Sequence, residues 1–134
     1  MIDFTNFKPD GQSPIYLQIL TFIKHGAVAG TIENGDPLPS RRNLSALLGI
    51  NPNTVQKAFS MLEDEGLVES RTGAKSVMVL DEEKIKRLRR ELLSESIKAL
   101  TEAMHQMDIS KEEALALIEK YWEETSYEKS SMNS

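Results

Sequence analysis

The stretch LPSRRNLSALLGINPNTVQKAFSMLEDEGLVES, residues 38–70, decides the fold. Ser40 is a suitable N-cap for a short helix that ends at Gly49, and Asn51 followed by Pro52 is typical of the start of a second helix. Apolar residues of the second helix recur at i, i+3, i+4 and i+7, which predicts one buried face: Val55, Ala58, Phe59 and Leu62. Two helices joined by so short a turn predict a helix-turn-helix.

The segments on either side extend this motif. A helix over about residues 14–29 should precede it, with Gly30 as its stop, and the short helix should bury Leu44, Leu47 and Leu48. Two strand-like runs, 67–71 and 76–80, follow the second helix and are joined by a connector that contains glycine, which fits a hairpin. This order of elements is that of a winged helix-turn-helix.

Residues 81–134 differ in composition and should be helical. We expect a long helix over 82–107 and, after a capping box at Ser110–Glu113, a last helix through about residue 124. Their apolar stripes are too long for a small winged domain to cover, so a second copy should bury the rest. The residues expected in this dimer interface lie on those stripes: Leu88, Leu92, Ile97, Leu100, Met104, Leu115, Ile118, Tyr121 and Trp122.

The expected fold class is therefore mainly α with a small β-hairpin. A winged helix-turn-helix DNA-binding domain should occupy residues 1–80, a two-helix dimerisation part residues 81–125, and a disordered tail residues 126–134. The length of 134 residues and a hydrophobic content of 40% suit one small domain with an appendage.

Composition excludes several kinds of site. The chain has no cysteine, which excludes disulfides and thiolate metal sites. His25 and His105 are far apart in sequence and have no carboxylates at metal spacing, so we expect neither a metal nor another cofactor. No run of 18 apolar residues and no signal-peptide pattern are present, which predicts no membrane partner and a cytoplasmic location.

The net charge of −5 argues mildly against a nucleic-acid partner, but its distribution reverses that inference. Residues 1–80 carry seven bases and eight acids, whereas residues 81–134 carry nine and thirteen. Arg41 and Arg42 lie in the first turn of the short helix and oppose its dipole, a cost that bound phosphate would offset. Five bases should form one positive surface: Arg41, Arg42, Lys57, Arg71 and Lys75.

The second helix of the motif carries polar groups opposite its apolar stripe. The Asn53 and Gln56 amides can donate to or accept from base edges, and Lys57 can also bind phosphate. Asn53 and Thr54 lie at the helix N-terminus, where free backbone N–H groups suit an anion. This face is suited to the DNA major groove.

Two stretches, IYLQILTFIKHGAVAG (15–30) and LPSRRNLSALLGINPNTVQKAFSMLEDEGLVESRTG (38–73), resemble the DNA-binding domain of the GntR family of bacterial transcriptional regulators. The Asn-Pro-Asn-Thr-Val run and the short helical C-terminal part resemble the YtrA-type subfamily, whose members dimerise through C-terminal helices. The resemblance implies DNA contacts at the two helix starts and at the hairpin. The expected DNA-binding residues are Ser40, Arg41, Arg42, Asn51, Pro52, Asn53, Thr54, Gln56, Lys57, Arg71, Gly73 and Lys75.

The sequence thus predicts a sequence-specific DNA-binding transcriptional regulator. The resemblance implies a dimeric repressor of a neighbouring operon, with a transporter as a candidate target, that binds a palindromic operator with half-sites about 34–36 Å apart. An enzyme is not expected, because no nucleophile–base pair or nucleophile elbow is present. The alternative is a winged-helix protein-interaction module that has lost DNA binding. Net acidity favours it, as do Pro52 and Gln56, where many relatives carry arginine, and Gly73-Ala74-Lys75 in place of Gly-x-Gly.

Three features leave alternatives open. The basic run at 84–90 is either an extended phosphate contact or a solvated helix face, and the second is favoured. Tyr121 and Trp122 are either interface core, which is favoured, or the wall of a pocket for an unidentified small-molecule effector. The acidic end at 63–65 opposes the dipole of its helix, and the sequence offers no reason for it.

Overall fold

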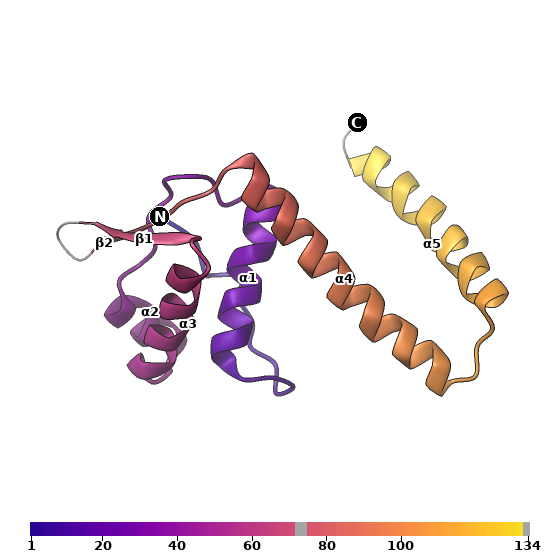
Figure 1. Ribbon diagram of the computed structural model, residues 1–134, viewed down its shortest axis with the longest axis horizontal. Helices are drawn as coiled ribbons and strands as arrows, with labels where there is room; N and C mark the ends of the chain where they lie inside the picture. The colour runs from indigo at the N-terminus through magenta and orange to yellow at the C-terminus, as the bar shows by residue number, and fades with distance from the viewer. Residues whose placement is uncertain (72–74, 133–134) are drawn as a thin grey trace. The chain divides into compact units, whose positions relative to one another are not determined.

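The computed structural model describes residues 1–71 and 75–132 and divides into two compact units, residues 1–92 and 93–134 (Figure 1). Its elements, in chain order, are α1 (Ile15–Ala29), α2 (Arg41–Leu48), α3 (Pro52–Asp64), β1 (Val68–Arg71), β2 (Lys75–Met78), α4 (Glu82–Gln106) and α5 (Lys111–Met132). The fold is mainly helical with one antiparallel hairpin, which confirms the expected class and the winged helix-turn-helix order.

Local chemistry sets the ends of α2 and α3. The Ser40 Oγ accepts a hydrogen bond of 3.0 Å from the Asn43 backbone N, and the Asn51 Oδ1 accepts one of 2.8 Å from the Asn53 backbone N. Gly49, between the two helices, has a φ of 66°, a left-handed conformation that favours glycine. The turn that joins α2 to α3 is therefore determined by the residues from which it was predicted.

The core of the first unit forms where α3 packs against α1 and α2. The predicted stripe of α3 is buried along its whole length, and Ile19 and Ile23 of α1 are fully buried. Leu44 of α2 has no exposed surface. Burial of this face leaves the other side of α3, with its polar side chains, to the solvent.

The hairpin is short and begins its second strand earlier than expected. Val68 pairs with Met78 and Arg71 with Lys75, so Lys75 belongs to β2 and not to the connector, a correction of one residue. Gly73, expected in the wing, lies outside the described residues. Val77 also bridges to Pro37, which ties the hairpin to the segment before α2.

An N-terminal arm, residues 1–13, adds a part of the core that the sequence did not predict. Ile2, Phe4 and Phe7 are buried, and the rings of Phe4 and Phe7 pack against Phe22 of α1 with centroids 5.1 and 5.5 Å away. The Ile2 backbone N donates to the Pro37 carbonyl oxygen at 3.0 Å. The arm therefore closes the first unit on the side of α1.

Two expectations about individual helices are wrong. Leu47 is 63% exposed, and Ser45 is buried in its place because its Oγ donates to the Ile50 carbonyl oxygen at 2.6 Å. Helix α5 continues to Met132 instead of ending near residue 124, so most of the expected tail is helical. Residues 125–132 contain neither glycine nor proline, so nothing in the sequence stops the helix there.

The first unit extends beyond residue 80 and includes the start of α4. Leu88 belongs to the same core cluster as α1 and α3, Ile85 packs against that cluster, and Leu92 is 9% exposed. Leu88 and Leu92 were expected in a dimer interface, and this is wrong because their side chains are buried within their own chain. Among the described residues, no helix has the length and apolar character needed to cross a membrane.

The two leucines of α2 provide a matched pair for testing the orientation of this helix. Leu44→Ala should lower the free energy of unfolding by about 2–5 kcal/mol, because it leaves a cavity in the core. Leu47→Ala should change it by less than about 0.5 kcal/mol, because the side chain is largely in solvent. Chemical denaturation of both variants measures this, and equal losses would contradict the observed orientation.

Candidate nucleic-acid interface

The exposed side of α3 carries the polar residues predicted to read DNA. Asn53, Gln56 and Lys57 are exposed, and Thr54 is half-buried. The Gln56 Nε2 donates to the Ser60 Oγ at 3.0 Å, one turn further along the helix. This hydrogen bond holds the Gln56 amide on the helix surface, where its oxygen can still accept a hydrogen bond from a base.

Asn51 plays a structural part at the start of α3. Its Oδ1 is occupied by the Asn53 backbone N, so the oxygen is already used within the protein. Pro52, the next residue, occupies the first helical position, where its missing N–H costs no hydrogen bond. Asn53, by contrast, is exposed, and its side chain makes no hydrogen bond with the described residues.

The start of α2 and the start of β2 line one hollow of about 370 Å³. Arg41 and Lys75 both line it, together with Asn43 and Ser76. The Arg41 guanidinium carbon lies 5.7 Å from the centre of the Phe59 ring, and the buried Nε of Arg41 has no hydrogen-bond partner among the described residues. Two cations thus meet at a helix N-terminus, an arrangement suited to a phosphate.

Lys57 is separate from that pair. Its Nζ lies 4.0 Å from the centre of the Tyr16 ring of α1, which is a cation–π contact. Sequence reasoning missed Tyr16. The available signal was an aromatic ring in the first turn of α1, on the apolar stripe that continues through Leu20 and Ile23, with a phenol that can reach the surface.

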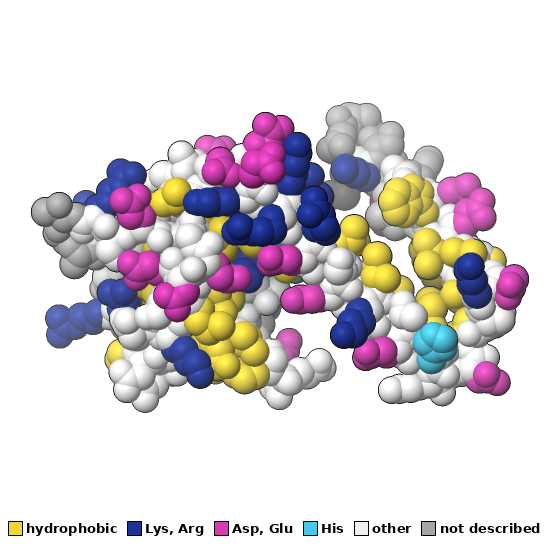
Figure 2. Space-filling view, in the orientation of Figure 1, with side chains coloured by type: hydrophobic (Ala, Val, Ile, Leu, Met, Phe, Trp, Pro, Cys, Tyr) yellow, Lys and Arg dark blue, Asp and Glu magenta, His cyan; other side chains and the backbone are white. Residues whose placement is uncertain are grey.

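Of the five bases predicted to form one positive surface, only some adjoin one another in the structure. Arg41 shares a hollow with Lys75, and Arg71 is the strand partner of Lys75 in the last pair before residues 72–74. Arg42 is exposed on α2, and Lys57 leans on α1. Figure 2 shows Lys and Arg side chains near α2 and the hairpin, with acidic side chains between them.

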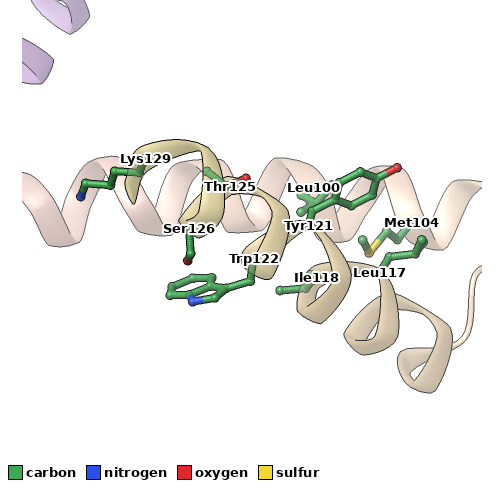
Figure 3. Close-up of a pocket in the computed structure, with 9 residues that line it drawn as sticks. All are labelled: Leu100, Met104, Leu117, Ile118, Tyr121, Trp122, Thr125, Ser126 and Lys129. Carbon is green, nitrogen blue, oxygen red and sulfur yellow. The ribbon is translucent and has the colours of Figure 1, made fainter. Parts of the chain in front are cut away.

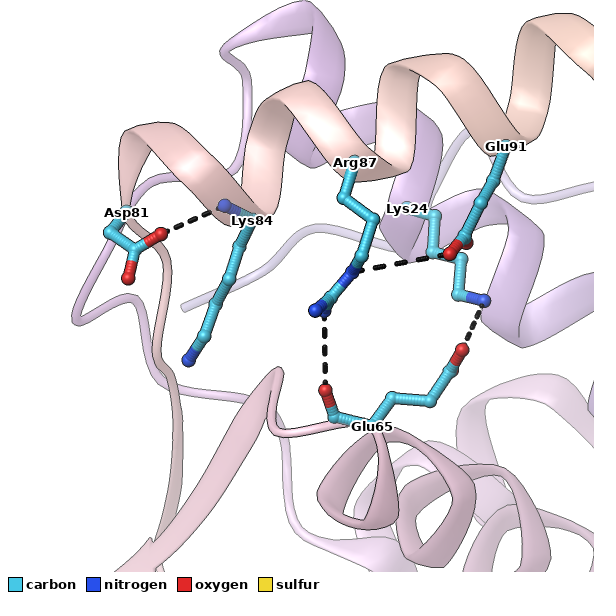
Figure 4. A network of polar contacts seen from close by, with 6 residues as sticks. All are labelled: Lys24, Glu65, Asp81, Lys84, Arg87 and Glu91. Carbon is cyan, nitrogen blue, oxygen red and sulfur yellow. Dashed lines mark hydrogen bonds and ion pairs between the residues drawn. The ribbon is translucent and has the colours of Figure 1, made fainter.

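Cations from two other helices contact the acidic end of α3 (Figure 4). The Lys24 Nζ of α1 lies 2.9 Å from the Glu65 Oε1. The Lys84 Nζ of α4 donates to the Gly66 carbonyl oxygen at 2.6 Å, and the Arg87 Nη2 donates to the Glu65 carbonyl oxygen at 3.4 Å. Two members of the basic run at 84–90 thus bind the end of α3, a role that sequence reasoning did not consider.

The second unit contains an apolar groove of about 610 Å³ (Figure 3). Leu100 and Met104 line it from α4, and Ile118, Tyr121 and Trp122 line it from α5. Tyr121 is 57% and Trp122 72% exposed, so the groove is an open surface and not a closed cavity.

No other chemistry is apparent in the parts of the chain that the structure describes. They contain no group of three His, Asp or Glu side chains that could hold a metal ion. A hydrogen bond from the Thr5 backbone lowers the pKa of Asp3 in the N-terminal arm, outside α2, α3 and the hairpin.

Comparison with known proteins gives consistent matches. The family model described as "Bacterial regulatory proteins, gntR family" matches residues 15–77. The uncharacterized HTH-type transcriptional regulator YhcF of Bacillus subtilis is 34% identical over 110 residues, 82% of this chain and 91% of that protein. The HTH-type transcriptional repressor YtrA of the same species is 43% identical over 65 residues, 48% of this chain and 50% of that protein.

Solved structures agree over longer stretches. A GntR family transcriptional regulator from Listeria monocytogenes has a TM-score of 0.73 and 31% identity, covering 84% of this chain and 98% of that one. YtrA from Sulfolobus acidocaldarius, described as a GntR-family transcription factor, has a TM-score of 0.53 and 29% identity, covering 90% and 99%. The similarity to these two structures therefore extends beyond the winged unit into the C-terminal part.

The capping role of Asn51 can be separated from DNA contact by stability measurements. Asn51→Ala should lower the free energy of unfolding by about 1 kcal/mol, because the Asn53 N–H loses its partner, whereas Asn51→Ser should retain most of that stability. Asn53→Ala, two residues away and exposed, is the control and should cost less than about 0.5 kcal/mol. A denaturation series in which Asn51→Ala is as stable as the parent would refute the capping role.

Proposed function

Because the chain belongs to the GntR family of bacterial regulatory proteins, in its YtrA-type branch, and is a DNA-binding transcriptional regulator, we propose that it acts as a dimeric repressor. It binds a palindromic operator with one winged unit on each half-site. The observation that carries the proposal is the capped helix α3, whose apolar face is buried and whose polar face is exposed next to the cationic hollow at α2.

In the proposed complex α3 lies in the major groove. Asn53 and Gln56 contact base edges, since both are exposed amides on the outer face of α3. Arg42 binds the phosphate backbone beside the start of α2, and Arg41 and Lys75 bind it at their shared hollow. Lys57 reaches a phosphate from its place above Tyr16, so Tyr16 supports that contact.

The remaining predicted residues have supporting parts in this interface. Ser40 and Asn51 cap the two helices that meet the DNA, so they orient backbone N–H groups as much as they make contacts of their own. Pro52 and Thr54 complete the first turn of α3. Arg71 flanks the hairpin tip opposite Lys75, where it can reach a neighbouring phosphate. Gly73 lies outside the described residues.

The dimer forms through the second unit. Four apolar residues of α4 and Met107, just after its end, follow a 4-3-4-3 spacing, typical of a seam between helices: Leu93, Ile97, Leu100, Met104 and Met107. Four of them, all except Met104, are at least 48% exposed, as are Leu115, Tyr121 and Trp122 of α5. So much exposed apolar surface on neighbouring helices favours a second copy over a small molecule as the occupant of the groove.

Repression follows from occupancy of a promoter by this dimer. The curated relative YtrA of B. subtilis is named a transcriptional repressor, and this chain matches half of its length. The proposed target is a neighbouring operon, with transporter genes as candidates. In a purified transcription reaction, the chain should lower transcript from a promoter that carries its operator, whereas an activator would raise it.

Selection of bound sites from random duplex DNA tests the DNA-binding proposal. The expected product is a palindrome with half-site centres about one or two helical turns apart, that is, multiples of about 34–36 Å. Enrichment of unpaired single sites would contradict the dimeric mode. Failure to enrich any sequence at low salt would favour a protein-interaction module instead.

Two variants separate phosphate contact from base contact on the selected operator. Arg42→Ala should weaken binding to all sequences and reduce the slope of log K against log salt by about 1, because one phosphate contact is lost. Gln56→Ala should mainly relax the base preference, by about 1–3 kcal/mol at one position. If both variants bind operator and mutated operators as the parent does, these assignments are wrong.

The oligomeric state tests the proposed interface directly. Leu100→Glu should convert the dimer to a monomer, because it places a charge in the apolar seam. Leu47→Glu is the matched control, since Leu47 is an exposed leucine of the first unit, and the protein should remain a dimer. Sedimentation or light scattering measures the mass, and a monomeric parent chain would refute the interface.

A further inference from the structure

The basic run of α4 contains two kinds of cation. Lys86, Arg89 and Arg90 are exposed, and their side chains make no hydrogen bond or ion pair with the described residues. Lys84 and Arg87 instead bind the carbonyl oxygens of Gly66 and Glu65, which follow α3. Figure 4 shows the bond from Arg87. Lys84 is the better placed of the two, because its Nζ lies 2.6 Å from the Gly66 oxygen and 3.3 Å from the Val79 oxygen.

The contact between the Lys84 ammonium group and the Gly66 carbonyl oxygen places positive charge where negative charge accumulates. The end of a helix carries the negative end of its dipole. The Met61, Leu62 and Glu63 carbonyl oxygens of α3 already accept hydrogen bonds from the backbone N–H groups of residues 65–67, so the two cations bind carbonyls just beyond the helix. Three acidic residues, 63–65, add negative charge at this end of α3. An ammonium group at Gly66 satisfies a carbonyl and offsets that charge, and Lys24 neutralises Glu65 from α1. Three helices of the first unit are therefore joined at the end of α3.

Apolar packing and the ammonium contact together determine how the first turns of α4 lie on this unit. Leu88 is 1% exposed in the core, and Ile85 packs against the same cluster. Apolar burial is non-directional, so by itself it tolerates rotation and sliding of a helix. A hydrogen bond from an ammonium group to two carbonyl oxygens, by contrast, has a required distance and angle. Lys84 therefore adds the directional constraint that Leu88 and Ile85 lack.

We propose that Lys84, assisted by Arg87, is a positioning residue that fixes the axis of α4 to the end of α3 and thereby sets the half-site spacing that the dimer accepts. This rests on the proposed function as a DNA-binding dimer. Helix α4 continues without interruption from the held turns to the residues of the proposed interface. The orientation of each α3 relative to the two-fold axis then depends on one helix, α4, whose first turns Lys84 holds against the end of α3.

If the contact between α3 and α4 at Lys84 is rigid, the dimer distinguishes operators by the distance between their half-sites. Each base pair added between two half-sites separates them by about 3.4 Å and rotates one about the DNA axis by about 34–36°, as a helical turn of 10–10.5 base pairs requires. A dimer whose α3 helices are held firmly cannot follow that change without breaking contacts. A dimer in which this contact is loosened follows it more easily, and it loses part of the advantage of the correct spacing because its arms are less well preorganised.

The test measures affinity for operators of different spacing. The full chain and three variants, Lys84→Met, Lys84→Arg and Lys86→Met, are titrated against the selected operator, against the same operator with the spacer one base pair shorter or longer, and against a duplex with one half-site. Lys86→Met is the matched control, because it removes the same charge from an exposed position two residues away.

For the parent and for Lys86→Met, a change of one base pair should weaken binding by about tenfold or more. For Lys84→Met this penalty should fall to about threefold or less, while affinity for the single half-site stays within about twofold of the parent. Lys84→Arg retains a cation that can donate to both carbonyl oxygens, so it should restore most of the spacing penalty.

The remaining outcomes overturn the proposal in distinguishable ways. If Lys84→Met keeps the full spacing penalty, or if the parent has none, Lys84 does not set the spacing, although the protein still functions as a DNA-binding dimer. If Lys84→Met loses single half-site affinity together with thermal stability, the residue only supports the fold. If the parent binds no duplex or is a monomer, the proposed function itself fails.

Discussion

The burial of one face of α3 is the constraint on which the rest of the structure depends. Val55, Ala58, Phe59 and Leu62 lie within 2% of full burial, and α1 and α2 supply the surfaces against which they pack. Once that face is buried, the opposite face is exposed, and its residues become available to a partner. The caps at Ser40 and Asn51 add a second restriction, because they determine where α2 and α3 begin and so which backbone N–H groups remain free. Core packing thereby presents the polar face of a DNA-binding helix.

The end of α3 and the start of α2 both carry charges that oppose the helix dipole. The two differ in whether charges within the protein compensate this unfavourable interaction. At the end of α3 the acidic residues are offset within the protein, by Lys24 at Glu65 and by Lys84 and Arg87 at the carbonyl oxygens. At the start of α2, Arg41 and Arg42 have no ion pair with any of the described residues, and Lys75 brings further positive charge to the same hollow. Unfavourable charge that is offset internally serves the fold, whereas charge left without a partner is suited to an external anion. This contrast distinguishes the two ends more clearly than net charge does.

Much of the first unit could be predicted from sequence, and the failures have physical causes. Caps, glycine stops and helical periodicity are local signals, so α1, α2, α3 and the hairpin were found within one or two residues. Leu47 was misplaced because three leucines within five residues fit two rotations of a short helix, and the hydrogen bond of Ser45 to Ile50 selects one of them. The burial of Phe4 and Phe7 depends on Phe22, and the role of Lys84 depends on a residue 18 positions earlier, so neither leaves a local pattern. Of the candidate site, the exposed polar face of α3 followed from periodicity, whereas the Arg41–Lys75 hollow and the Tyr16–Lys57 contact required tertiary structure.

The apolar stripe of α4 shows why the limits of a proposed interface need a structure. A stripe indicates which face of a helix is covered, but not by what. In α4 the cover changes along the helix: Leu88 is buried in the winged unit, whereas Leu93, Ile97 and Leu100 remain exposed. A unit with few bases neutralises few phosphates, so in the proposed complex a single half-site is bound weakly. Affinity then depends on joining two such units, since the second contact occurs at a high effective concentration only when the geometry permits both. For a protein of this charge, the helix that links the winged unit to its partner is therefore as much a part of DNA recognition as the side chains of α3.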